Sequence, residues 1–281
     1  MAGTAALRVR IVYVGTSAFA GAVLRRLHDS PHSPVLVVSR PDSPQGRGRK
    51  LTSPPTVEVA RELGLDVYQP GSVNSEESLA RIDVARPDAL CVCAFGSLIK
   101  EPLLSRYQIL NVHPSLLPRW RGAAPIERAI LAGDPETGVS IMRLTAGLDS
   151  GPVCLEGRVA IEADDDYGTL SASLEALGGD LLVRALDEQP PCAEQDESGV
   201  TYAEKLTAAD RRLDPSEPAA ARARRVRALS PHIGAYVVQP DGTRLGVWKA
   251  RAVGDTLELL IVQPPGKRQM PWADYQRGLK Q

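Results

Sequence analysis

The chain has 281 residues, of which 43% are hydrophobic and 24% are charged, and its formal net charge is −1. This length accommodates one large domain and a smaller one, and the composition is ordinary for a globular protein. No apolar run approaches the roughly 20 residues of a membrane span, and the N-terminus lacks the apolar core of a signal peptide. We therefore expect no membrane association and a cytoplasmic location.

Cysteine and histidine are both scarce in this sequence. The four cysteines fit a reduced cytosolic chain better than a disulfide framework: Cys91, Cys93, Cys154 and Cys192. Cys91 and Cys93 alternate on one expected strand, where they act as small core residues. The four histidines have no metal-ligand spacing with one another or with the cysteines, so no metal is expected.

The charge is distributed unevenly along the chain. Residues 1–200 carry 19 Lys and Arg against 26 Asp and Glu, whereas residues 201–281 carry 14 against 8. A basic C-terminal segment on an acidic body indicates that this segment contacts a polyanion. Drift of solvated surface charge is the alternative interpretation.

Strands and helices alternate over the first two thirds of the chain. Apolar runs predict strands at 8–14, 35–38, 66–68, 89–94, 108–112, 139–144 and 153–161. Helices are predicted at 18–28, 56–63, 75–86, 124–132 and 169–186. Thr56 can N-cap the second of these helices. This order predicts an α/β fold with a doubly wound, mainly parallel sheet that helices cover on both faces. Residues 15–21 lack the Gly-x-Gly-x-x-Gly spacing, so dinucleotide binding is not expected.

The composition shifts to Pro, Asp, Glu and Ser between residues 189 and 218, as in a linker. Beyond it, the pattern predicts a basic helix and then three strands: 219–229, 235–238, 243–248 and 256–262. Asp241-Gly242 indicates a hairpin turn between the first two strands. The expected organisation is a catalytic domain, a linker and a C-terminal domain, at 1–190, 191–206 and 207–281.

Two polar side chains stand where the expected strand at 108–112 ends. Asn111 and His113 occupy positions i and i+2, so both point to the same side, and Pro114 stops the strand. Ligands of open α/β sheets bind at the carboxyl ends of the strands. An Asn amide can donate a hydrogen bond to a carbonyl oxygen, and a His can handle a proton. A histidine that only caps backbone groups is the alternative.

The run Asn-Val-His-Pro-Ser-Leu-Leu-Pro at 111–118 resembles the motif of the folate-dependent formyltransferases. Its extension Arg-Trp-Arg-Gly-Ala-Ala-Pro-Ile at 119–126 is similar to the methionyl-tRNA formyltransferase branch of that family. Further stretches that resemble this branch are 41–50, 137–142, 148–151, 201–206 and 263–267. The resemblance therefore extends over nearly the whole chain. It implies a Rossmann-like formyltransferase fold.

The resemblance also implies a reaction and its partners. The expected activity is transfer of the formyl group of 10-formyltetrahydrofolate to the amino group of methionyl initiator tRNA, by a monomer. Asn111 would stabilise the oxyanion, His113 would take the proton, and Asp149 would stabilise the charged imidazole. An Asp before Ser-Gly is also a common turn residue, which is the alternative for Asp149.

Two sets of binding residues follow from the same resemblance. The folate co-substrate is expected against Ser115, Leu116, Leu117, Pro118, Phe95, Gly96 and Leu98. Ordinary core packing is the alternative for Leu98 and for its neighbour Ile99. The acceptor end of the tRNA is expected to contact a mobile basic loop at 40–55 and the segment at 201–206, through Arg47, Arg49, Lys50 and Lys205. A plain solvated loop is the alternative for the first of these.

The C-terminal domain departs from the family pattern. The resemblance implies a small β-barrel of the oligonucleotide-binding type, with a longer segment between Lys249 and Gln263 than this chain has. Either a loop and strands have been lost, which would leave an abridged barrel, or residues are absent from this sequence. Two rival functions remain: a formyltransferase that acts on small amines, and an RNA-binding protein without catalysis. The first would not need the basic loop, and the second would not need Asn111, His113 and Asp149 together.

Overall fold

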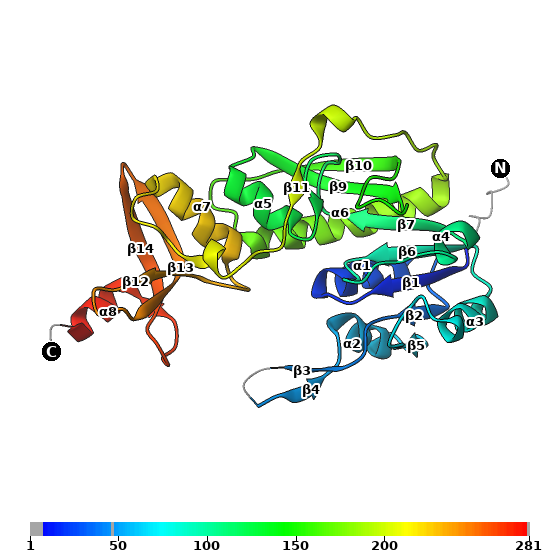
Figure 1. Ribbon diagram of the computed structural model, residues 1–281, viewed down its shortest axis with the longest axis horizontal. Helices are drawn as coiled ribbons and strands as arrows, with labels where there is room; N and C mark the ends of the chain where they lie inside the picture. Colours follow the sequence, from blue (N-terminus) through cyan, green and yellow to red (C-terminus); the bar gives the residue numbers. More distant parts are fainter. Residues whose placement is uncertain (1–7, 46–47, 280–281) are drawn as a thin grey trace. The chain divides into compact units, whose positions relative to one another are not determined.

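The computed structural model describes residues 8–45 and 48–279 (Figure 1). Contacts group the chain into two compact units. The N-terminal unit contains Met1–Arg121, Gly138–Arg158 and Ala172–Thr201. The C-terminal unit contains Gly122–Thr137, Val159–Ser171 and Tyr202–Gln281. The division into folding domains at 1–190, 191–206 and 207–281 stays a prediction.

A seven-stranded sheet forms the centre of the N-terminal unit (Figure 1). In spatial order its strands are β10 (Val153–Ala160), β9 (Glu136–Arg143), β7 (Gln108–His113), β6 (Ala89–Cys93), β1 (Ile11–Gly15), β2 (Leu36–Val38) and β5 (Val67–Tyr68). The pairs from β5 through β7 are parallel, whereas β9 pairs with β7 in the antiparallel direction. The predicted doubly wound, mainly parallel sheet is therefore confirmed.

Helices cover both faces of this sheet because its central strands β1, β2 and β6 are apolar on both sides. The Tyr13 hydroxyl donates to the carbonyl of Ala20, 2.7 Å away, so this side of β1 faces helix α1 (Ala18–His28). Helix α6 (Tyr167–Glu188) lies close to β7, since a Cβ at Gly178 would be 3.0 Å from Val112. Val12, Val14 and their neighbours pack in a core with α3 and α4 (Glu76–Ala85 and Leu103–Arg106).

The helix starts follow from local hydrogen bonds. Ser17 caps α1 and Ser75 caps α3, each accepting a backbone N–H with its hydroxyl. The prediction that Thr56 is an N-cap is wrong. Helix α2 (Pro55–Glu62) begins one residue earlier, and the buried Thr56 hydroxyl instead donates to the carbonyl of Ser17, 3.0 Å away.

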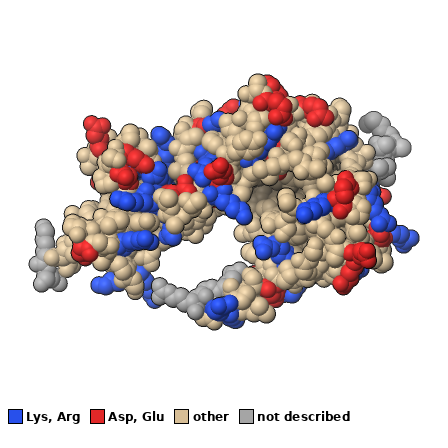
Figure 2. Space-filling model, viewed as in Figure 1, with Lys and Arg blue, Asp and Glu red and all other residues tan. Residues whose placement is uncertain are grey.

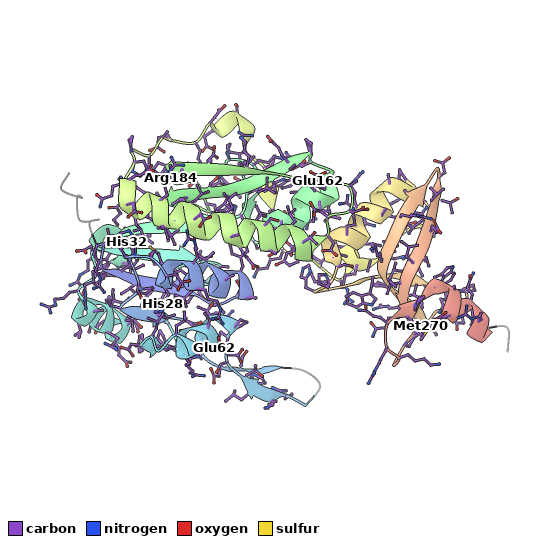
Figure 3. All side chains as sticks on the ribbon, turned by 180° about the vertical axis from the view of Figure 1, so that it is seen from behind. His28, His32, Glu62, Glu162, Arg184 and Met270 are labelled. Carbon is purple, nitrogen blue, oxygen red and sulfur yellow. A yellow bond between two sulfur atoms is a disulfide. The ribbon has the colours of Figure 1, made fainter. Side chains whose placement is uncertain are left out.

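A buried histidine joins the start of β1 to the end of α6. His32, which Figure 3 labels, is fully buried. Its Nδ1 accepts the backbone N–H of Val9 at 3.1 Å, and its Nε2 lies 2.9 Å from Asp187 Oδ1. Because Nδ1 accepts, Nε2 carries the proton and donates to the carboxylate. Both ring nitrogens are thus occupied by structural contacts.

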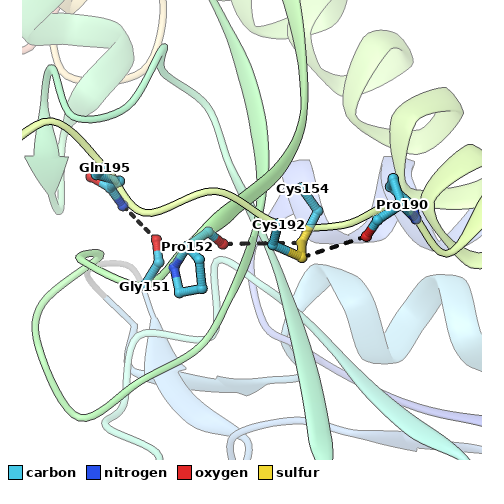
Figure 4. The surroundings of a disulfide bond; sticks show 6 residues. All are labelled: Gly151, Pro152, Cys154, Pro190, Cys192 and Gln195. Atoms are coloured by element: carbon cyan, nitrogen blue, oxygen red, sulfur yellow. Dashed lines mark hydrogen bonds between the residues drawn. A yellow bond between two sulfur atoms is a disulfide. The ribbon is translucent and has the colours of Figure 1, made fainter.

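One disulfide corrects the expectation of four free thiols. Cys154 on β10 and Cys192, after α6, form a disulfide across a sequence separation of 38 (Figure 4). The segment after α6 folds back onto the start of β10, where Val153 and Ala193 exchange backbone hydrogen bonds of 2.8 and 2.9 Å. This pairing brings the two cysteines together. It is a long-range contact, so no local sequence pattern predicts the disulfide. Cys91 and Cys93 are free and buried, as predicted.

The C-terminal unit contains a four-stranded antiparallel sheet in the order β12 (Ala235–Val238), β13 (Arg244–Val253), β14 (Thr256–Gln263) and β15 (Met270–Pro271). Its strands belong to a small barrel-like domain with a core of its own, which helix α7 (Ala219–Leu229) joins through Val226 and Leu229. The hairpin predicted at Asp241-Gly242 is confirmed, since Gln239 N–H donates to the carbonyl of Thr243 at 2.8 Å. Strand β13 is longer than predicted.

The remaining elements are short. They are β3 (Ser43–Gln45), β4 (Lys50–Thr52), β8 (Arg121–Gly122), α5 (Pro125–Ala132), β11 (Tyr202–Ala203), two 3-10 turns (Glu197–Gly199 and Ala209–Arg211) and α8 (Trp272–Leu279). Strands β3 and β4 pair as a hairpin within the basic loop expected at 40–55. Across residues 8–45 and 48–279, no helix has the length and apolar character needed to cross a membrane.

Candidate active site

The site lies at the carboxyl end of β7, near the middle of the sheet. His113 is the last residue of this strand, and Asn111 precedes it by two positions, so both side chains point to the same side. Asn111 is 8% exposed and His113 is 4% exposed. The strand partners of His113 and Asn111 on β9 are Ser140 and Met142. The predicted strand end, with its paired amide and imidazole, is confirmed in position.

Protein groups face both nitrogens of the His113 ring. Nε2 lies 2.9 Å from the carbonyl oxygen of Trp120, and Nδ1 lies 3.7 Å from Oδ2 of Asp149. A carbonyl oxygen can only accept, so Nε2 carries a proton and donates it. In the neutral ring Nδ1 is therefore the basic atom, and it faces the Asp149 carboxylate. A proton taken at Nδ1 produces an imidazolium whose charge this carboxylate stabilises.

Asp149 belongs to a tight turn and faces the histidine at the same time. Its backbone has φ 44°, in the left-handed region that non-glycine residues seldom adopt. A Cβ at Gly151, in the same turn, would stand 1.9 Å from the carbonyl oxygen of Arg143. The turn therefore runs directly against β9. Asp149 is therefore a turn residue whose carboxylate also lies 3.7 Å from His113 Nδ1, and its role toward the imidazole stays a prediction.

The Asn111 amide remains available for a ligand. Among the side-chain hydrogen bonds of the described residues, none involves Asn111, although the side chain is nearly buried. The amide is not among the fully buried side-chain atoms of the described residues that lack a partner, so it is accessible and suited to a partner that arrives with substrate. Its N–H can donate to the oxygen of a carbonyl under attack.

The loop after β7 is fixed by hydroxyl groups. The Ser115 hydroxyl donates to the carbonyl of Arg119 at 2.6 Å, and the N–H of Leu117 donates to the Ser140 hydroxyl at 3.1 Å. The Ser140 hydroxyl donates in turn to the carbonyl of Ser115 at 2.8 Å. These three hydrogen bonds hold the backbone of residues 115–118 in one conformation. Sequence reasoning did not single out Ser140, although it lies within the family-like stretch 137–142.

The other residues expected to contact folate differ in their surroundings. Phe95 is 5% exposed and packs in the core on one face of the sheet, whereas Leu98 is 69% exposed. Ile99 belongs to the same core as Phe95, in agreement with the packing alternative for that residue. Gly96 lies between them with φ 75°. Folate contacts by Phe95, Gly96, Leu98 and residues 115–118 stay predictions.

The residues expected to bind tRNA are on the surface wherever the structure describes them. Arg49 and Lys50 are exposed beside the hairpin of β3 and β4, and Lys205 is exposed in the C-terminal unit. Arg47 lies outside the described residues. No group of three or more His, Cys, Asp or Glu suited to hold a metal ion occurs in the described part of the chain.

The geometry suits one class of chemistry. A donor for a developing oxyanion, a base and a carboxylate behind that base lie together in the N-terminal unit, on β7 and the turn before β10. Acyl transfer to an amine requires these functions, because the carbonyl must be polarised and the attacking nitrogen must lose a proton.

Comparisons with known proteins give the family. A formyl transferase family model matches residues 7–186. The chain is 40% identical over 296 residues to a methionyl-tRNA formyltransferase of Methylococcus capsulatus, covering 95% of this chain and 96% of the relative. It is 41% identical over 302 residues to that of Halorhodospira halophila, covering 97% of each. The solved methionyl-tRNA formyltransferase from Clostridium thermocellum has the same fold, with TM-score 0.65 at 12% identity over 92% of this chain and 99% of that one. The chain belongs to the methionyl-tRNA formyltransferase family.

Proposed function

We propose that this chain transfers the formyl group of 10-formyltetrahydrofolate to the free amino group of methionyl initiator tRNA. The observation that carries the proposal is the arrangement of Asn111, His113 and Asp149 at the end of β7, in a member of this family.

Each side chain has one task in the proposed mechanism. The amino nitrogen attacks the formyl carbon, and the carbonyl electrons move to an oxyanion that accepts the Asn111 N–H; such a donor contributes about 3–4 kcal/mol. His113 takes the ammonium proton at Nδ1, where Asp149 faces it, which contributes about 10²–10⁴-fold. The tetrahedral intermediate collapses, the bond to N10 of the folate breaks, and His113 returns the proton to that nitrogen.

The tRNA contacts are proposed on the basic side chains of both units. Arg47, Arg49, Lys50 and Lys205 are proposed to contact the acceptor end, where phosphates and the first base pair lie. Figure 2 shows Lys and Arg beside Asp and Glu on the C-terminal unit, where Arg225 pairs with Glu217 and Arg251 with Glu258. Lys267 and Arg268 are exposed and make no ion pair with the described residues, which leaves them for phosphates.

We also propose that the chain acts as a monomer in the cytoplasm. Asn111, His113 and Asp149 all come from a single chain, so the proposed chemistry needs no second subunit. Charged initiator tRNA is present where translation begins.

The test is transfer of labelled formyl from 10-formyltetrahydrofolate to methionyl initiator tRNA. Free methionine and a charged elongator tRNA serve as controls, and the expected result is fast transfer to the initiator tRNA alone. Faster formylation of a small amine, such as glycinamide ribonucleotide or an amino-sugar nucleotide, would contradict the proposal and favour the small-amine branch of the fold.

A further inference from the structure

A hydrogen-bonded pair of side chains, Arg121 and Gln195, holds the turn that carries Asp149. Gln195 Nε2 donates to the carbonyl oxygens of Asp149 at 2.8 Å and of Gly151 at 2.7 Å, the second of which Figure 4 shows. Its Oε1 accepts two hydrogen bonds from Arg121, from Nε at 3.0 Å and from Nη2 at 2.8 Å. All of these residues belong to the N-terminal unit.

Every hydrogen-bonding position of the Gln195 amide is occupied. An amide has two N–H donors and an oxygen that accepts two hydrogen bonds, and all four positions are occupied here. Arg121 is 3% exposed, and its Nη2 lies 2.8 Å from Glu197, which balances its charge. A side chain without two donors at position 195 would remove both hydrogen bonds to the carbonyl groups of Asp149 and Gly151. Glutamate would place a negative charge against them.

The residue before Arg121 contacts the other side of the His113 ring. Trp120, its neighbour, provides the carbonyl that accepts from His113 Nε2. Thr201 holds this dipeptide, because its hydroxyl accepts the N–H of Trp120 at 2.9 Å and its carbonyl accepts the N–H of Arg121 at 2.9 Å. The same short segment therefore fixes the ring at Nε2 and, through Gln195, the carboxylate that faces Nδ1.

We infer that Arg121 and Gln195 are positioning residues for formyl transfer, which hold the Asp149 carboxylate against His113 through the backbone of the turn. The inference rests on the proposed function, because it uses the roles given to His113 and Asp149. The Cys154–Cys192 disulfide and the Val153–Ala193 backbone pair fasten the segment that carries Gln195 to β10. These contacts hold the segment of Gln195 against β10 in addition to the hydrogen bonds that Gln195 makes with the turn.

The principal test is Gln195→Met, which keeps the length of the side chain and removes every hydrogen bond. We expect kcat to fall roughly tenfold or more, with KM for tRNA and for the folate changed by less than about twofold, because only the transition state uses the carboxylate. In an Asp149→Asn background the same substitution should lower kcat by less than about twofold further, because its effect passes through the carboxylate.

Two controls separate positioning from loss of structure. Glu194→Met introduces the same side chain at the adjacent exposed position and should keep wild-type kcat. Arg121→Lys keeps the charge but cannot give two parallel hydrogen bonds, so it should lose less activity than Arg121→Met. Should Gln195→Met fail to fold, Gln195→Glu, which keeps an acceptor for Arg121 and removes both donors, takes its place in the kinetic test.

Three outcomes overturn the inference. They are a wild-type kcat in the Gln195 variant, losses that multiply fully in the double variant with Asp149→Asn, and a crystal structure of Gln195→Met in which the carboxylate stays 3.7 Å from Nδ1. The crystal structure requires no activity, so it decides the inference even where wild-type protein fails to formylate initiator tRNA. That failure would count against the proposed function alone.

Discussion

His113 is oriented by a backbone carbonyl on one side of its ring and faces a carboxylate on the other. The carbonyl of Trp120 selects the nitrogen that holds the proton of the neutral ring, and so it also selects the nitrogen that acts as base. Asp149 has φ 44°, in the left-handed region, and lies in the turn that places its carboxylate on the Nδ1 side.

Asp149→Asn separates the charge of this side chain from its size. The variant should fold as wild type does, because the amide keeps the volume, and its kcat should fall by about 10²-fold or more because an amide cannot stabilise the imidazolium. Thermal unfolding and steady-state kinetics on methionyl initiator tRNA check the two halves of this expectation. Wild-type turnover would leave Asp149 as a turn residue only.

The buried thiols of Cys91 and Cys93 should make the free energy of unfolding depend on pH in the alkaline range. Burial, and then the mutual repulsion of their ionised forms, raises the pKa of Cys91 to about 12, and burial raises that of Cys93 to about 12. Unfolded thiols lose their protons near pH 9 while the folded ones keep theirs. The free energy of unfolding should therefore fall above pH 9, by about 1.4 kcal/mol per pH unit for each thiol.

Denaturant titrations at pH 8, 9 and 10 measure this slope. The matched control is the Cys91→Ala, Cys93→Ala double variant, whose stability between pH 9 and 10 should fall less steeply than that of wild type. Equal slopes in the two proteins would show that these thiols do not contribute to the pH dependence.

The site residues differ in how far the sequence predicts them. The alternation of a strand places Asn111 and His113 on one side without further information, whereas Asp149 required the family resemblance. Gln195 could not be found, because it lies in a Pro- and acid-rich stretch whose composition is that of a linker. Its partners Arg121 and Gly151 are distant in sequence, so only the folded chain brings them together.

Most elements of the fold follow from local patterns. The strands of the parallel sheet are continuous apolar runs, and helix α7 spans the predicted residues. The errors arose where tertiary contacts outweigh local preference: the Thr56 hydroxyl bonds to Ser17 rather than capping its helix, and β13 continues to Val253 because β14 pairs with it along that length. The disulfide depends on the same kind of long-range return.

Removal of the disulfide tests the element that folds back onto β10. The bridge closes a chain segment with a sequence separation of 38, for which the loss of chain entropy in the unfolded state gives about 4 kcal/mol. A reducing agent should therefore lower the temperature at which the N-terminal unit unfolds. The Cys154→Ser, Cys192→Ser variant should unfold at that lower temperature and show no further response to reductant. An equal unfolding temperature of the wild type with and without reductant would show that the disulfide does not stabilise the N-terminal unit.

At the scale of the whole molecule, the charge and the chemistry are separated along the sequence. The proposed catalytic side chains belong to the N-terminal unit, while residues 201–281 carry 14 basic against 8 acidic side chains. Several of the 14 basic groups are paired with acids inside the C-terminal unit, so fewer than 14 are free to contact a polyanion. The exposed, unpaired cations are the ones expected to bind tRNA.

The salt dependence of tRNA affinity measures those contacts. Each phosphate contact contributes about 0.7–0.9 to the slope of log K against log salt concentration. The triple variant Lys249→Ala, Lys267→Ala, Arg268→Ala should therefore reduce the slope by about two and leave folate binding unchanged. Lys100→Ala, an exposed lysine in the N-terminal unit, is the control and should keep the wild-type slope. An unchanged slope in the triple variant would show that tRNA is bound elsewhere.

The central claim, that the end of β7 carries out formyl transfer, is tested most directly by single-turnover kinetics of Asn111→Ala and His113→Ala. The rate of formyl transfer from 10-formyltetrahydrofolate to methionyl initiator tRNA and the affinity for that tRNA are measured on the same preparations. Each variant should transfer formyl at least about tenfold more slowly with an almost unchanged tRNA affinity, because these side chains act on the reacting groups. Parallel loss of rate and affinity, or a wild-type rate in either variant, would contradict the account.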